Sequence, residues 1–161
     1  MRKIRTAVLI SGGGSNMEAL ATASQATDFP ASIEIVISNK ANAKGLKKAQ
    51  KISISTCVID HTSFKTREKF EQELHAKLEE FNIELICLAG FMRILTPDFV
   101  GKWPGRLINI HPSLLPKYKG LHTHQRAISA GDKEHGCTVH YVNEHMDEGK
   151  IIAQAKVSVL P

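Results

Sequence analysis

Hydrophobic positions along the chain follow two periods, and these periods predict where strands and helices lie. Short apolar runs bounded by turn residues are typical of buried strands. They occur at 5–10, 32–38, 54–59, 83–88, 106–111, 137–142 and 151–159. Helical spacing of apolar residues, or helix-forming composition, predicts helices near 17–21, 43–51, 66–81, 97–100 and 123–130. The last two strands alternate enough between apolar and polar residues to suggest a less buried, antiparallel edge.

Strands that alternate with helices over most of the chain favour an α/β domain. The expected architecture is a single doubly wound, mostly parallel sheet with helices on both faces, spanning residues 1–161. In such sheets ligands bind beyond the carboxyl ends of the strands. A glycine loop at 11–16, a turn at 90–95 and the polar pair Asn109 and His111 all fall at such ends. These three features predict one binding site at that edge.

The strand at 106–111 ends in two polar residues. Because residues two apart on a strand point to the same face, Asn109 and His111 are expected side by side. Pro112 keeps the residue before it out of the helical region, which predicts that His111 is still extended. An amide and a titratable imidazole at one strand end suit catalysis. The alternative is a strand that simply ends in polar residues, with the histidine bonded to backbone.

Three glycines, Gly12 to Gly14, separate the first strand from the first helix. Glycine lets the backbone approach a ligand closely, and the free N–H groups at a helix start favour an anion. Ser15 and Asn16 add donors, and the loop fits neither a Walker A motif nor a dinucleotide fingerprint. A phosphate monoester is therefore the expected ligand. The alternative is a tight turn in which Ser15 or Asn16 caps the helix.

The polar loop at 143–149 holds a third candidate residue, Asp147. Beside an imidazole its carboxylate would favour the protonated ring and fix its orientation, which would make His111 a general acid. The alternative is a solvated turn, because Asp and Gly are common in turns. Phe91 and Met92 could similarly line a pocket for a flat ring or belong to the core.

Histidines and cysteines form neither a metal motif nor a disulfide framework in this sequence. The eight histidines include His122 and His124, but there is no H-E-x-x-H motif and no Cys/His set with ligand spacing, so no metal is expected. Cys57, Cys87 and Cys137 lie in apolar or β-rich runs without a C-x-x-C pair. They are predicted to be reduced core residues, which favours a reducing, cytoplasmic setting.

Composition is that of an ordinary globular chain, with 161 residues, of which 42% are hydrophobic. The net charge of +5 favours an anionic partner, but the basic residues are spread without a long run. A phosphorylated small molecule fits this charge as well as nucleic acid does, and aromatic residues for stacking on RNA are sparse. The apolar run ending at Ile10 is too short for a signal sequence or a membrane span.

Four segments together resemble the phosphoribosylglycinamide formyltransferase family of purine synthesis. They are SGGGSN at 11–16, LAGFMRIL at 88–95, the stretch 109–120 that begins NIHPSLLP, and GCTVHYVNEHMDEG at 136–149. The match covers nearly the whole chain. It implies transfer of the formyl group of 10-formyltetrahydrofolate to the amine of glycinamide ribonucleotide, without a metal, in a monomer or homodimer that binds neither nucleic acid nor membrane.

The resemblance also implies a role for individual residues. The substrate phosphate would lie on Gly14, Ser15 and Asn16. The folate cosubstrate would contact Arg67, Met92, Arg93, Ile94, Leu95, Asn109, Asn143, Glu144, His145, Met146 and Asp147. Asn109 and protonated His111 would stabilise the tetrahedral oxyanion, while Asp147 would keep His111 protonated and oriented.

The sequence departs from the family pattern in two places. Family members usually continue past the position of Pro161 into a helical segment that contributes a glutamate to the ribonucleotide site, so the sequence is expected to be incomplete or a shortened form. Lys150 stands where proline is common, in an exposed loop expected to tolerate it.

Two other enzymes, methionyl-tRNA formyltransferase and formyltetrahydrofolate deformylase, share the Asn, His and Asp core. The first would need a further C-terminal domain and the second a further N-terminal domain. A non-catalytic phosphate or RNA binder is the alternative outside the enzyme class.

Overall fold

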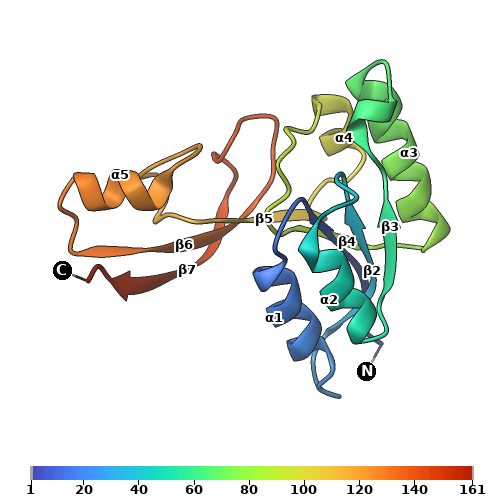
Figure 1. Ribbon diagram of the computed structural model, residues 1–161, viewed down its shortest axis with the longest axis horizontal. Coiled ribbons are helices and arrows are strands. Elements are labelled where there is room, and N and C mark those ends of the chain that lie inside the picture. The colour runs from blue at the N-terminus through green and yellow to red at the C-terminus, as the bar shows by residue number, and fades with distance from the viewer. Residues whose placement is uncertain (1, 161) are drawn as a thin grey trace.

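A computed structural model describes residues 2–160, and it has one sheet of seven strands flanked by helices (Figure 1). The strands are β1 (Ile4–Ile10), β2 (Ala31–Ser38), β3 (Ser55–Val58), β4 (Leu85–Leu88), β5 (Leu107–His111), β6 (Glu134–Tyr141) and β7 (Ile151–Ser158). The helices are α1 (Ser15–Ser24), α2 (Lys44–Lys51), α3 (Arg67–Glu80), α4 (Pro97–Gly101) and α5 (Thr123–Ser129), with a 3₁₀ turn, η1, at His61–Ser63. Every predicted strand and helix is present, whereas η1 was not predicted.

The strand order β3-β2-β1-β4-β5-β6-β7 is that of a doubly wound sheet. The first five strands run parallel, whereas β6 is antiparallel to both β5 and β7. The predicted fold class and the antiparallel edge are therefore confirmed. Because the order reverses between β1 and β4, the connections after these two strands leave in opposite directions and open a crevice at their carboxyl ends.

Apolar residues of β1 pack on both faces of the sheet, which explains why this strand is a continuous hydrophobic run. Ala7 and Leu9 belong to the core beneath α3 and α4, while Val8 and Ile10 belong to the core beneath α1 and α2. Figure 1 shows these two helix pairs on opposite sides of the sheet. All four side chains are fully buried. Burial on both faces fixes the strand register, since a slip by one residue would exchange the two sets.

The chain beyond β5 forms an arm of β6, β7 and α5 that extends to one side in Figure 1. Every residue of β7 is exposed. The expectation about the chain at Pro161 falls on a residue outside those that the structure describes. No helix between residues 2 and 160 has the length and apolarity required to cross a bilayer.

The three cysteines carry free thiols, but only Cys87 lies fully in the core, since Cys57 and Cys137 are half-buried. The prediction of three core cysteines is therefore wrong for two of them. Cys57 lies on the short edge strand β3, and Cys137 lies on β6 between β5 and exposed β7, where packing is incomplete. Burial raises the pKa of the Cys87 thiol to about 11, so this group is protonated at neutral pH.

Candidate functional site

The glycine loop after β1 and the turn after β4 are joined directly by hydrogen bonds. The Ser11 N–H donates to the Gly90 carbonyl over 3.1 Å, and the Met92 N–H donates to the Ser11 hydroxyl over 2.8 Å. That hydroxyl in turn donates to the side-chain oxygen of buried Asn39. Ser11 thus holds the two loops against each other at the crevice that the strand order predicts.

A hollow of about 300 Å³ lies between these two loops. Gly12 to Asn16 line one side, and Gly90 and Met92 line the other, with Lys40 also in the lining. Gly14, with φ 71°, occupies the N-cap position of α1, and no side chain caps the helix. The alternative that Ser15 or Asn16 is the cap is therefore wrong. Both are the first residues of α1 and are exposed, so their N–H groups and side chains are available to an anion.

Asn109, His111 and Asp147 lie together at the end of β5, although the last comes from a distant loop. His111 Nδ1 is 3.4 Å from Asp147 Oδ1, and His111 Nε2 donates to the Tyr118 carbonyl over 2.8 Å. Both ring nitrogens of His111 therefore face oxygen acceptors. The His111 residue is only 5% exposed and the Asp147 side chain 9%, so water screens their interaction weakly. A catalytic role for the three residues stays a prediction.

His140 belongs to the same cluster and was not singled out from the sequence. It lies opposite Asn109 in the β5–β6 pairing. Its Nδ1 lies 2.9 Å from the Tyr141 carbonyl, an acceptor, so this nitrogen donates. Nε2 is then free to accept from Asn109 Nδ2 at 3.3 Å. His140 therefore orients the Asn109 amide, and only the antiparallel register of β6, which the sequence suggests weakly, could have indicated it.

Asp147 reaches the cluster because its backbone adopts a left-handed conformation, with φ 56°. Its second carboxylate oxygen accepts from the Gly120 N–H over 2.8 Å. The 143–149 loop is thus anchored on the segment after β5, which makes the alternative of a freely solvated turn wrong for Asp147. The residues before it, Asn143 to Met146, are exposed.

The remaining predicted cofactor contacts are distributed over two elements. Met92, 61% exposed, and Ile94 project from the turn after β4, whereas Leu95 is buried. Arg93 is half-buried, and its Nε has no hydrogen-bond partner within residues 2–160. Arg67 begins α3 and is exposed. Within the same residues, no hydrogen bond or ion pair joins the Arg67 side chain to the other candidates.

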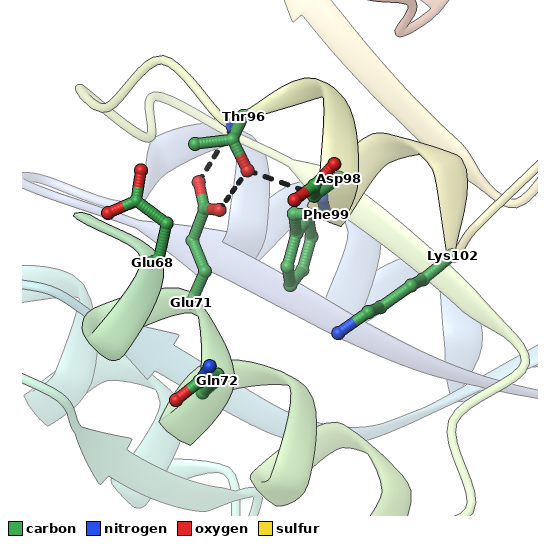
Figure 2. Close-up of a pocket in the computed structure, with 7 residues that line it drawn as sticks. All are labelled: Glu68, Glu71, Gln72, Thr96, Asp98, Phe99 and Lys102. Carbon is green, nitrogen blue, oxygen red and sulfur yellow. Dashed lines mark hydrogen bonds between the residues drawn. The ribbon is translucent and has the colours of Figure 1, made fainter.

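A smaller hollow of about 60 Å³ lies between α3 and α4, and the polar groups beside it join these two helices. Figure 2 shows the carboxylate of buried Glu71 directed at Thr96, whose N–H it accepts over 2.7 Å and whose hydroxyl also donates to it. Thr96 in turn caps α4 by accepting from the Phe99 N–H. Glu71 thus fastens the end of the 90–95 turn to α3.

Replacing Glu71 with glutamine should lower the free energy of unfolding by about 1–3 kcal/mol. The amide NH₂ of the glutamine would face a donor of Thr96, so that two buried donors meet without an acceptor. Urea unfolding measures this change. Glu68→Gln removes the same charge from an exposed position in the same hollow and should cost less than about 1 kcal/mol. Equal losses in the two variants would contradict the assigned role of Glu71.

No group of three or more His, Cys, Asp or Glu residues within residues 2–160 is arranged to hold a metal ion. His124 and His135 do contact each other at 2.9 Å between ring nitrogens. Burial and the neighbouring His124 lower the pKa of His135. The pair lacks a third ligand from the described part of the chain.

Comparison with known proteins finds a single family along nearly the whole chain. The profile of the formyl transferase family matches residues 4–161. A phosphoribosylglycinamide formyltransferase of Haemophilus influenzae is 49% identical over 161 residues, which is 100% of this chain and 75% of that protein. A trifunctional purine biosynthetic protein adenosine-3 of Drosophila melanogaster is 52% identical over 99% of this chain, which spans only 12% of its length.

Solved structures give the same result for the fold. A phosphoribosylglycinamide formyltransferase from Brucella melitensis superposes with a TM-score of 0.95 at 52% identity, over 99% of this chain and 82% of that one. A second, from Coxiella burnetii, superposes with a TM-score of 0.93 at 48% identity, over 99% and 75% of the two chains.

Proposed function

The chain belongs to the formyl transferase family, and on that premise we propose that it transfers the formyl group of 10-formyltetrahydrofolate to the amine of glycinamide ribonucleotide. The products are formylglycinamide ribonucleotide and tetrahydrofolate. The observation that carries the proposal is the buried contact of His111 with Asp147, 3.4 Å apart, beside the amide of Asn109. Similarity to enzymes with this activity names the substrates.

The proposed reaction is an acyl transfer in two steps. The lone pair of the glycinamide amine forms a bond to the formyl carbon, and the carbonyl electrons move to oxygen, giving a tetrahedral oxyanion. The carbon bond to N10 of the folate then breaks, and the proton lost by the amine goes to N10. Because the oxyanion carries the charge that develops, donors and a positive group placed beside it lower the barrier.

The side chains of the cluster suit these steps. Asn109 gives one amide hydrogen to His140 and keeps the second for the oxyanion. A His111 ring protonated at both nitrogens would satisfy the Tyr118 carbonyl and the Asp147 carboxylate together, and its charge would stabilise the oxyanion in a site with little water. Asp147 thus orients the ring and compensates its charge.

The two loops at the crevice supply the proposed binding surfaces. The phosphate of the ribonucleotide binds at Gly14, Ser15 and Asn16, where the start of α1 provides free N–H groups. The folate binds along the surface formed by Arg67, Met92 to Leu95 and the 143–147 loop. We place the reaction in the reducing cytoplasm, which the free cysteines favour.

Formyl transfer by this chain, followed by folate absorbance, tests the proposal. We expect turnover with glycinamide ribonucleotide and a KM at least tenfold higher with the riboside that lacks the phosphate, because the glycine loop loses its anion. Methionyl-tRNA and water serve as rival acceptors. Formylation of the tRNA, or release of formate without acceptor, would overturn the assigned substrate.

A further inference from the structure

A short segment after β5 touches both members of the His111–Asp147 pair. The Tyr118 carbonyl accepts from His111 Nε2 over 2.8 Å, and two residues later the Gly120 N–H donates to Asp147 Oδ2 over 2.8 Å. The backbone of this segment therefore forms hydrogen bonds with both the imidazole and the carboxylate. Its conformation determines how the two groups face each other.

The backbone of this segment is unusual because Tyr118 is left-handed, with φ 56°. A residue with a Cβ loses about 1–2 kcal/mol in this conformation, so other contacts must maintain it. Gly120 is also left-handed, at φ 79°, but glycine adopts that conformation without strain. The position that directs a carbonyl at His111 is therefore the strained one.

Contacts of the Tyr118 side chain compensate for the strain. The Tyr118 hydroxyl donates to Asp132 Oδ2 over 2.8 Å, and the Arg126 guanidinium lies 5.2 Å from the centre of the Tyr118 ring. The hydrogen bond that Tyr118 donates to Asp132 raises the pKa of the tyrosine hydroxyl, and hydrogen bonds from Lys117 and Tyr118 lower the pKa of Asp132. At neutral pH the hydroxyl thus keeps its proton and the carboxylate its charge.

We propose that Tyr118 and Asp132 are positioning residues for His111: their side-chain hydrogen bond fixes the left-handed Tyr118 backbone, and the Tyr118 carbonyl then fixes the imidazole against Asp147. This role rests on the proposed function for its effect on catalysis, but the contact with the ring exists without substrate. Neither residue lies in the glycine loop or in the turn after β4. Their loss should act on turnover and leave substrate binding intact.

The test uses Tyr118→Phe, Asp132→Ala and the double variant, each measured for kcat, both KM values and melting temperature. We expect each single change to lower kcat by about 5- to 20-fold, because a misplacement of about 1 Å can cost 10²-fold. The double variant should be no worse than the worse single variant, since both changes break one hydrogen bond. Both KM values should stay within about twofold.

Lys156→Met is the control, because Lys156 also pairs with a carboxylate of the same arm, Glu134 at 3.2 Å, but has no hydrogen bond or ion pair with Tyr118 or Asp132 within residues 2–160. It should leave kcat unchanged. Raised KM values with unchanged kcat in Tyr118→Phe would overturn the proposal. So would an equal loss of kcat in Lys156→Met.

Nitrogen-15 resonances of the His111 ring, recorded on the chain without substrate, separate this proposal from the proposed function. We expect the Nε2 resonance to move in Tyr118→Phe and Asp132→Ala and to stay in place in Lys156→Met. Unmoved resonances in the first two variants would overturn the positioning role even if formyl transfer is observed. A shifted resonance in a chain that transfers no formyl group would support the contact and reject only the proposed function.

Discussion

Replacement of His111 by alanine should lower kcat for formyl transfer by about 10²- to 10³-fold, the range expected when a group that stabilises the oxyanion is removed. The imidazole is nearly fully buried, and no other titratable side chain within residues 2–160 lies as close to Asp147. The variant would leave the Asp147 carboxylate without its imidazole partner and the proposed oxyanion without the His111 ring beside it. Steady-state kinetics with glycinamide ribonucleotide measure the loss.

His75→Gln is the control for this experiment. His75 lies half-buried on α3 against Phe99 and Trp103, and it does not line the crevice. Its replacement should leave kcat within about twofold, since it touches none of the proposed site residues. A fall of less than about tenfold in His111→Ala would show that this imidazole does not take part in the chemistry.

Gly14→Ala should lower the free energy of unfolding by about 2–4 kcal/mol, the sum of backbone strain and overpacking. Gly14 has φ 71°, and an added Cβ would lie 2.7 Å from the Cα of Gly45. This clash is with backbone at the start of α2, so no side-chain rotation can relieve it. Urea unfolding measures this change, and kinetics with ribonucleotide and riboside should show loss of the phosphate preference in any protein that still folds.

Gly13→Ala is the matched control next to it, because no heavy atom lies within 4 Å of a Cβ at Gly13. Its stability should stay within about 0.5 kcal/mol of the parent. If the loop binds a phosphate through its backbone, the same methyl group should still raise the KM for the ribonucleotide. Equal stability of Gly14→Ala and the parent would contradict the close contact between α1 and α2.

Periodicity predicted the parallel part of the fold because burial on two faces leaves continuous apolar strands, as in β1. Asn109 and His111 were likewise predictable, since neighbours two apart on a strand need no long-range information. The N-cap residue of α1 was not predictable, because Ser15 and Asn16 are typical caps and only the three-dimensional turn places Gly14 at that position. The 3₁₀ turn η1 is too short to leave a period.

The contacts between distant segments were the part that local sequence could not supply. Asp147 lies in a loop whose composition is typical of a solvated turn, and only the pairing of β6 with β5 brings it to His111. His140 alternates along β6 like any buried strand residue, so its bond to Asn109 depends on the register of that pairing. Family resemblance predicted Asp147, whereas neither the local sequence nor the family resemblance singled out His140.

The antiparallel pairing of β5 with β6 also determines when the site can exist during synthesis of the chain. The first five strands leave the ribosome before β6 and can pair among themselves with a core on each face. His111 is then already at its strand end, but Asp147 and His140 follow later and must close a long loop to reach it. A nascent chain stopped before β6 would thus hold the ligand crevice of β1 and β4 without the groups proposed to act there.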